Sequence, residues 1–230
     1  TMKQTIYHLI VLDESGSMYG ITHQTITGCN ETIDTIKAAA EQFAETQEHF
    51  VSIYSFQGSG RRPSRYIIKN VPAKDVNPIT SEDYQPCGCT PLNDAVGSTL
   101  TDLEVSVKDN ENALGSVTII TDGYENASKR YTFEQVRNKI SALKEMGWNF
   151  NFIGANIDAQ ATARSYNIDN ALQFQQSVEG TKAMFARECS SKMAFLRDLD
   201  CCFSLCGDED LSAEEKVKLR KEAGKDYYKK

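Results

Sequence analysis

The residues best suited to chemistry in this sequence are oxygen donors. Asp13, Ser15 and Ser17 follow an apolar run at alternate positions, Thr90 lies in the segment Cys-Gly-Cys-Thr-Pro-Leu, and Asp122 follows another apolar run. Hard divalent cations such as Mg²⁺ prefer oxygen ligands. Two carboxylates and three hydroxyls would leave such a cation electron-poor and ready to accept a carboxylate from outside. The set therefore predicts a metal site that binds and does not catalyse.

The elements that must position these residues alternate between strand and helix patterns. Near-continuous apolar runs predict buried strands, and apolar residues spaced three to four apart predict helices. The predicted strands span about residues 5–13, 49–58, 65–70, 116–123, 148–156 and 171–177, and the helices about 25–43, 91–109, 132–147, 158–168 and 179–199. This order predicts an α/β fold: a doubly wound, mostly parallel six-stranded sheet with helices on both faces and one antiparallel edge strand from a hairpin.

The predicted sheet places the oxygen donors together. Ligands of an open parallel sheet bind beyond the carboxyl ends of its strands. Asp13 ends the first predicted strand, Asp122 ends the fourth, and Thr90 precedes a helix. Each has a simpler interpretation, since Asp and Ser favour turns, Thr90 could cap the helix after Pro91 and Asp122 with Gly123 could form a turn. Three such coincidences are less favoured than one site.

The three loops together resemble the metal-ion-dependent adhesion site (MIDAS) of von Willebrand factor A (VWA) domains. That site has the pattern D-x-S-x-S, then a later threonine and a later aspartate. The flanks are also similar, with Met after the last serine, Thr-Pro-Leu around the threonine and Thr-Asp-Gly around the second acid. The order of elements extends the resemblance over roughly residues 3–200, and it implies a Rossmann-like VWA fold.

The resemblance also implies a role for each residue of the site. Ser15 and Ser17 would bind the metal directly, and Thr90 directly or through water. Asp13 and Asp122 would act mostly through bound waters and as acceptors of hydrogen bonds from the serines. The cation would be Mg²⁺, with Mn²⁺ or Ca²⁺ as alternatives, and a Glu or Asp of a protein partner would complete its coordination. The expected function is a metal-dependent protein–protein interaction domain, similar to standalone cytoplasmic microbial members such as tellurite-resistance-like proteins.

Residues beside the site are candidates for contact with the partner. Tyr19, Tyr124 and Glu125 lie just past the metal residues, and interface cores favour aromatic side chains. Arg61 and Arg62 lie in the predicted hairpin on the same side of the sheet and could steer an acidic partner toward the cation. The alternative for all five is ordinary solvated surface.

An enzyme is the first alternative. Asp13 could accept a phosphoryl group in a Mg²⁺-dependent phosphatase or phosphotransferase. The haloacid-dehalogenase type requires a second Asp two residues later, where this chain has Ser15, and no phosphate-binding P-loop is present. His8, His23 and His49 are scattered and form no Ser-His-Asp arrangement. Glu14, the variable position within the first motif, is assigned no role, and we expect no enzyme activity.

A cysteine-based zinc or redox module is the second alternative. The chain has seven cysteines, an odd number that favours reduced thiols over a disulfide scaffold. Cys29 falls in a helix pattern and reads as a core residue. The others that could supply zinc ligands are Cys87, Cys89, Cys201, Cys202 and Cys206. However, C-x-C is not the usual C-x₂-C spacing, and no histidine is close in sequence to either group.

Composition bounds the class and location of the protein. The 230 residues suit one α/β domain, and a net charge of −7 argues against a nucleic-acid partner. There is no apolar run long enough to cross a membrane and no apolar core of a signal peptide, so we expect a cytoplasmic protein. The oligomeric state stays open.

The expected domain boundary lies near residue 206. Residues 1–206 would form the VWA domain and 207–230 a charged C-terminal tail. Ser212 and Glu215 have the spacing of a capping box, so a short helix could start there. We expect this tail to be solvated, with a docking arm for a partner as the alternative.

Overall fold

A six-stranded sheet forms the centre of the computed structural model, which describes residues 3–58, 62–206 and 211–229. Its strands lie in the order β3-β2-β1-β4-β5-β6. They are β1 (Gln4–Asp13), β2 (Gln47–Phe56), β3 (Arg65–Pro72), β4 (Ala113–Thr121), β5 (Asn149–Gly154) and β6 (Asn170–Gln173). The β2–β3 pairing is antiparallel and the other four are parallel, which confirms the predicted fold class.

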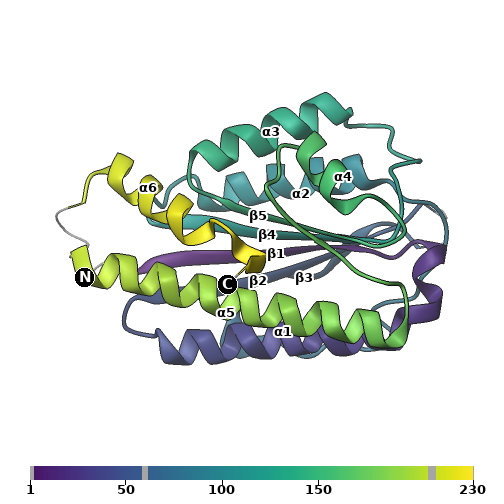
Figure 1. Ribbon diagram of the computed structural model, residues 1–230, viewed down its shortest axis with the longest axis horizontal. Coiled ribbons are helices and arrows are strands. Elements are labelled where there is room, and N and C mark those ends of the chain that lie inside the picture. The colour runs from purple at the N-terminus through teal and green to yellow at the C-terminus, as the bar shows by residue number, and fades with distance from the viewer. Residues whose placement is uncertain (1–2, 59–61, 207–210, 230) are drawn as a thin grey trace.

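Helices cover both faces of this sheet. The helices are α1 (Thr22–Gln42), α2 (Leu92–Val107), α3 (Phe133–Glu145), α4 (Ala159–Ser165), α5 (Val178–Cys206) and α6 (Ala213–Gly224), with short 3₁₀ turns η1 (Gly16–Ile21), η2 (Ala73–Asp75) and η4 (Tyr227–Lys229). Helices α2, α3 and α4 lie on one face and α1 and α5 on the other (Figure 1). Within the described ranges, none of these helices is long and apolar enough to span a membrane.

The apolar run of β1 explains its place at the centre of the sheet. Side chains alternate across a strand, so Leu9 and Val11 join the core on the α2 and α3 face. Ile10 and Leu12 join the core on the α1 face. A strand that is apolar toward both faces is buried on both, and its end at Asp13 is therefore held in a fixed position.

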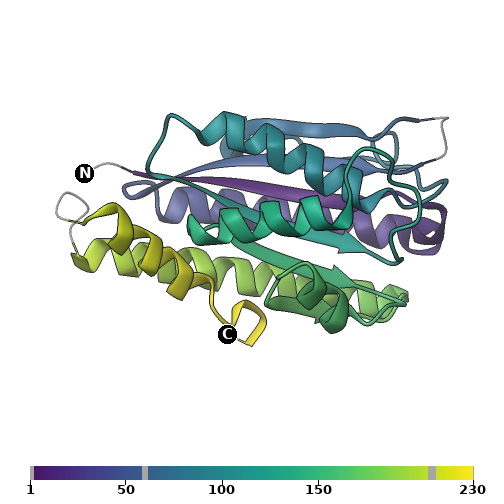
Figure 2. The same ribbon diagram turned by 90° about the horizontal axis from the view of Figure 1, so that it is seen from above.

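The C-terminal segment packs against the sheet, and Figure 2 shows α6 beside the end of α5. Its first turn has the predicted capping box, with the Ser212 hydroxyl accepting from the Glu215 amide. Arg220, Ala223 and Tyr227 are buried, and the Arg220 guanidinium donates to Gln4 Oε1 at 2.8 Å. The expectation of a solvated tail was wrong for the described residues 211–229, because an aromatic ring and a paired guanidinium anchor them.

Two buried histidines face each other from β1 and β2. His8 Nε2 and His49 Nδ1 are 3.0 Å apart. Burial, helped by the charge of Lys192, holds the pKa of His8 well below its usual value, and burial lowers the pKa of His49 to about 4. Both rings are therefore neutral in the folded protein at neutral pH.

These histidines predict a loss of stability in mild acid. Below pH 6.5 the unfolded chain protonates them while the folded chain does not, so protons favour unfolding. The free energy of unfolding should fall by up to about 1.4 kcal/mol per pH unit for each histidine as pH drops below about 6.5. Urea unfolding at pH 7.0 and 5.5, compared between the parent protein and a histidine variant, measures this change, because burial raises the pKa of Asp13 to about 6 and so acts in the opposite direction.

Two variants isolate the contribution of the pair. His49→Gln should flatten the pH dependence, whereas His23→Gln should preserve it because His23 is exposed. An unchanged slope in His49→Gln would contradict this prediction.

Candidate metal centre

The predicted site residues meet where β1 and β4 end. Asp13 is fully buried, and its Oδ1 accepts a hydrogen bond from the Ser15 amide at 2.7 Å. The hydroxyls of Ser15 and Ser17 are 3.1 Å apart, and Ser17 donates to Asp122 Oδ1 at 2.6 Å. The Thr121 hydroxyl donates to Asp13 Oδ2 at 2.6 Å. Hydrogen bonds thus connect the first and third loops directly.

The Thr90 loop lies against both of these loops. The Gly16 amide donates to the Gly88 carbonyl at 3.0 Å, and Gly88 has φ of +77°, a left-handed conformation that glycine adopts freely. The Thr90 amide donates to Asn126 Oδ1 at 2.8 Å. A Cβ on Gly123 would lie 3.6 Å from Thr90 Oγ1, so the threonine hydroxyl is next to the residue that follows Asp122. All five predicted residues therefore gather at one edge of the sheet.

The two acids carry unfavourable negative charge. Burial raises the pKa of Asp13 to about 6, and the nearby Asp122 adds to the effect, although hydrogen bonds from Thr121 and Ser15 oppose it. Burial also raises the pKa of Asp122. Buried carboxylates resist ionisation unless positive charge is near. A divalent cation would supply that charge, and the donors around the acids are oxygens that suit a hard ion.

Gln176, from the loop between β6 and α5, joins the site although the sequence analysis did not identify it. Its Nε2 donates to the Ser17 carbonyl at 2.7 Å and to Asp122 Oδ2 at 2.6 Å. The side chain of Asn156 donates to its Oε1. The predicted strand 171–177 hid this residue, because β6 in fact ends at Gln173 and leaves Gln176 in a loop at the carboxyl end of the sheet.

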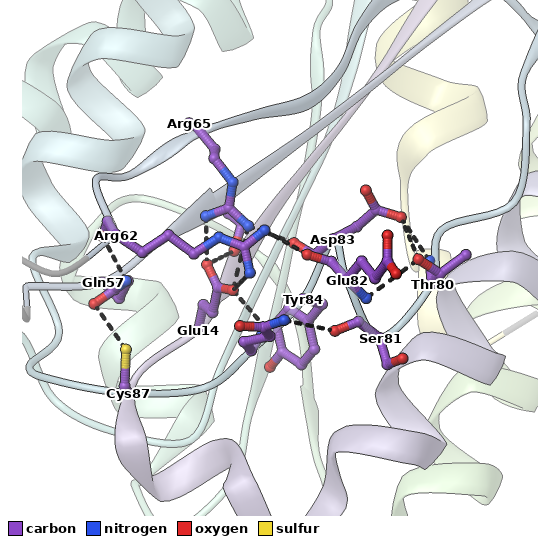
Figure 3. A network of polar contacts seen from close by, with 12 residues as sticks. Glu14, Gln57, Arg62, Arg65, Thr80, Ser81, Glu82, Asp83, Tyr84 and Cys87 are labelled. Carbon is purple, nitrogen blue, oxygen red and sulfur yellow. Dashed lines mark hydrogen bonds and ion pairs between the residues drawn. The ribbon is translucent and has the colours of Figure 1, made fainter.

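Glu14 holds the first loop in place through a buried charge network (Figure 3). The carboxylate is fully buried. Its Oε2 accepts hydrogen bonds from Arg65 at 2.8 Å and from the Ser55 hydroxyl at 2.7 Å. Its Oε1 accepts one from the main-chain amide of Gln85 at 2.6 Å. Paired in this way the buried charge is tolerable. Because Arg65 and Arg62 already compensate its charge, Glu14 positions the loop of residues 13–17 and is not a candidate ligand.

The two predicted steering arginines have different outcomes. The Arg62 guanidinium lies 3.9 Å from Glu14 Oε1 and donates to the Glu82 carbonyl, so it points inward to the same network (Figure 3). A structural role accounts for Arg62. Arg61 lies outside the described residues.

The other three contact candidates, Tyr19, Tyr124 and Glu125, differ in whether their side chains are already bonded within the protein. Tyr19 is 77% exposed and Tyr124 is 60% exposed, and each follows a loop that carries predicted metal ligands. Glu125, in contrast, has its carboxylate bonded to the amides of Asn93, Ala127 and Ser128. Glu125 therefore stabilises its own loop, whereas the two tyrosines present free aromatic surface.

The cysteines whose side chains the structure describes do not form one group. Cys87 lies beside Gln57, with Sγ 3.4 Å from Oε1, and Cys89 is exposed. Cys201 lies 23 residues into α5, roughly 35 Å from its start at a rise of about 1.5 Å per residue. In the described part of the chain, no three His, Cys, Asp or Glu side chains gather closely enough to hold a metal ion. A cation at the sheet edge would therefore depend on hydroxyl ligands beside its two carboxylates.

Solved structures with very different sequences share this fold. The manganese-loaded TRAP protein of Plasmodium vivax matches with a TM-score of 0.52 at 14% identity, over 79% of this chain and 72% of that one. The pilus adhesin SpaC of Lactobacillus rhamnosus GG matches at 0.59 and 13% identity, over 84% of this chain and 31% of the adhesin. Proximal thread matrix protein 1 of the mussel byssus, with a zinc-occupied MIDAS motif, matches at 0.51 and 11% identity, over 83% of this chain and 46% of that one. No protein-family model and no curated protein sequence matches the chain.

The Glu14 network predicts a large effect of a small change. Glu14→Gln leaves Arg65 without its countercharge and should lower the free energy of unfolding by about 2–3 kcal/mol. That is less than the roughly 3–5 kcal/mol typical of a fully buried pair, because the Arg65 side chain is 24% exposed. Urea unfolding measures the change.

A matched control lies on the same strand as Arg65. Lys69 pairs with Asp102 in the open, so Lys69→Gln should cost less than about 1 kcal/mol. Equal stability losses in Glu14→Gln and Lys69→Gln would show that burial of the Glu14 pair has no special weight.

Proposed function

We propose that this protein is a VWA-type domain that holds a divalent cation at the edge of its sheet and presents it to an acidic side chain of a protein partner. The observation that carries the proposal is the hydrogen-bonded chain from Asp13 through Ser15 and Ser17 to Asp122, with Thr90 beside it. Mg²⁺ is the expected cation, with Mn²⁺ or Ca²⁺ as alternatives.

The hydrogen bonds of the two acids support a binding role. Asp13 accepts from Ser15 and Thr121 on its two oxygens, and Asp122 accepts from Ser17 and Gln176 on its two. The hydroxyl oxygens of Ser15, Ser17 and Thr90 therefore remain as ligands for a cation. A cation held mainly by neutral oxygens keeps much of its positive charge. Such a cation attracts a carboxylate from outside, which is the proposed mode of partner binding.

The distribution of exposed apolar side chains supports a protein partner. Six large ones are exposed in the described part of the chain: Tyr19, Val105, Tyr124, Phe133, Met146 and Val178. Tyr19 and Tyr124 follow the metal loops, and Phe133 and Val178 begin helices that start at the same edge. Val105 and Met146 instead lie where α2 and α3 end. Exposed aromatic surface marks interaction sites, and here two exposed rings, Tyr19 and Tyr124, follow the loops of the candidate metal centre.

The structural neighbours agree with this proposal in kind. One is described as manganese-loaded, one as an adhesin and one as a matrix protein with a metal-occupied MIDAS. A cytoplasmic location and the standalone, tellurite-resistance-like type are further proposals that rest on the sequence resemblance alone.

We propose no catalytic role for Asp13. A nucleophilic carboxylate must reach a substrate, yet this side chain is fully buried and hydrogen-bonded on both oxygens. The phosphatase alternative therefore has no observation in its favour.

The proposal predicts which variants lose the cation. Asp122→Ala and Ser15→Ala should each weaken Mn²⁺ binding at least tenfold, about 1.4 kcal/mol, because each removes an oxygen from the set. Isothermal titration calorimetry with Mn²⁺, then Mg²⁺, measures the affinity, and circular dichroism verifies the fold.

Ser81→Ala is the control, since this exposed serine lies outside the donor set. It should bind Mn²⁺ like the parent protein. Parent-like Mn²⁺ affinity in Asp122→Ala would reject the metal centre.

A further inference from the structure

A hollow of about 380 Å³ opens beside the candidate metal centre. Its walls include Leu92, Gly123, Tyr124, Phe133, Ala161 and Tyr166. Gly123 belongs to both places, because it follows Asp122 directly and a Cβ on it would lie 3.6 Å from Thr90 Oγ1. Only a short stretch of backbone therefore separates the hollow from the proposed ligands.

The walls of this hollow are fixed before any ligand arrives. The Tyr166 hydroxyl donates to Asn93 Oδ1 at 2.7 Å. The main-chain amide of Asn93 donates to Glu125 Oε2 at 2.7 Å. The Phe133 ring packs edge-on against Tyr166 with centroids 4.8 Å apart. A ligand that enters a preformed hollow loses little affinity to ordering the protein.

The charges around the hollow indicate which ligand it accepts. Among the described residues, Glu125 and Asp158 are the charged ones that line it. Glu125 is bonded to main-chain amides, and Asp158 caps α4 by accepting from the Ala161 amide at 2.8 Å. Its described lining therefore contains no cation that would pair with an acidic side chain, and its own two acids are hydrogen-bonded. Its aromatic rim, Tyr124 and Phe133, favours an uncharged apolar side chain.

We propose that this hollow binds an aromatic or branched aliphatic side chain of the same partner segment that gives its Glu or Asp to the cation. The inference rests on the proposed function. The cation recognises the acid, which many proteins expose, and the hollow adds selection for an apolar residue a few positions away. A buried anchor beside a charged contact is how interfaces concentrate their binding energy.

A peptide library tests the hollow with the full chain. The library has one fixed Glu with random flanks and is selected in the presence of Mn²⁺. Enriched peptides should bind only with the cation present and should share an aromatic or branched aliphatic residue at a constant distance from Glu.

Two variants locate that residue on the protein. Ala161→Trp fills the hollow from α4 and should weaken the enriched peptides at least tenfold while Mn²⁺ affinity stays unchanged. Phe133→Ala removes a wall and should act in the same direction, which keeps the test decisive if the tryptophan disturbs folding. Arg164→Trp is the matched control, because Arg164 is exposed on α4 and does not line the hollow. It should change neither affinity.

The outcomes separate the two proposals. Metal-dependent peptides with no apolar preference, or peptides that bind Ala161→Trp and Phe133→Ala as tightly as the parent, overturn the hollow and leave the metal-dependent function standing. Mn²⁺ binding without any metal-dependent peptide also overturns the hollow. A protein that binds neither Mn²⁺ nor metal-dependent peptides overturns both proposals.

Discussion

The parallel pairing of β1 with β4 is the constraint on which the candidate site depends. Leu12 lies opposite Ile120 in this register, so Thr121 ends β4 beside Asp13 and donates its hydroxyl to that carboxylate. Asp122 follows immediately and meets Ser17. A shift of one residue would turn each side chain to the other face of the sheet. The observed register lets the Thr121 hydroxyl reach Asp13 and the Ser17 hydroxyl reach Asp122, and a shifted register would lose both hydrogen bonds.

This arrangement places three acids in a small volume, and each is compensated in a different way. Glu14 is neutralised within the protein by Arg65 and Arg62. Within the described ranges, Asp13 and Asp122 accept hydrogen bonds from hydroxyls, a main-chain amide and a side-chain amide, and burial raises the pKa of each. Arg62 and Arg65 thus pair with Glu14, the acid that anchors the loop. In the part of the chain that the structure describes, the two acids at the sheet edge have no basic side chain among their hydrogen-bond donors, which suits a positive charge that comes from outside the chain.

The sequence predicted whatever depends on local periodicity. The apolar runs identified the strands, and the three motifs at their ends identified the residues that the fold brings together. Gln176 does not stand out in the sequence, because its signal is only a position after a strand and the predicted strand 171–177 extends beyond the end of β6 at Gln173. Glu14 was passed over because its partners, Arg65 and the Gln85 amide, are distant in the chain.

The prediction of a solvated C-terminal segment was wrong for a related reason. Its charged composition is typical of a solvated helix, and nothing local distinguishes an arginine that will pair with a buried glutamine from one that faces water. Arg220 reaches Gln4 across 216 positions of sequence. The His8–His49 contact likewise joins residues 41 positions apart. The spacing of apolar residues predicts local helices and strands, but it does not predict which polar residues will pair across long stretches of sequence.

The packing of α6 also bears on where a partner binds. Arg220 contacts Gln4 at the start of β1, Lys216 contacts Asn112 just before β4, and Asn170 at the start of β6 donates to the Gly224 carbonyl. These contacts place α6 over the amino ends of the strands. The carboxyl ends instead carry the oxygen donors and the exposed rings of Tyr19 and Tyr124. Helix α6 thus covers one end of the sheet. The other end combines two buried carboxylates, Asp13 and Asp122, with exposed aromatic surface. That asymmetry favours the carboxyl end of the sheet as the place where the proposed cation, and through it the proposed partner segment, would bind.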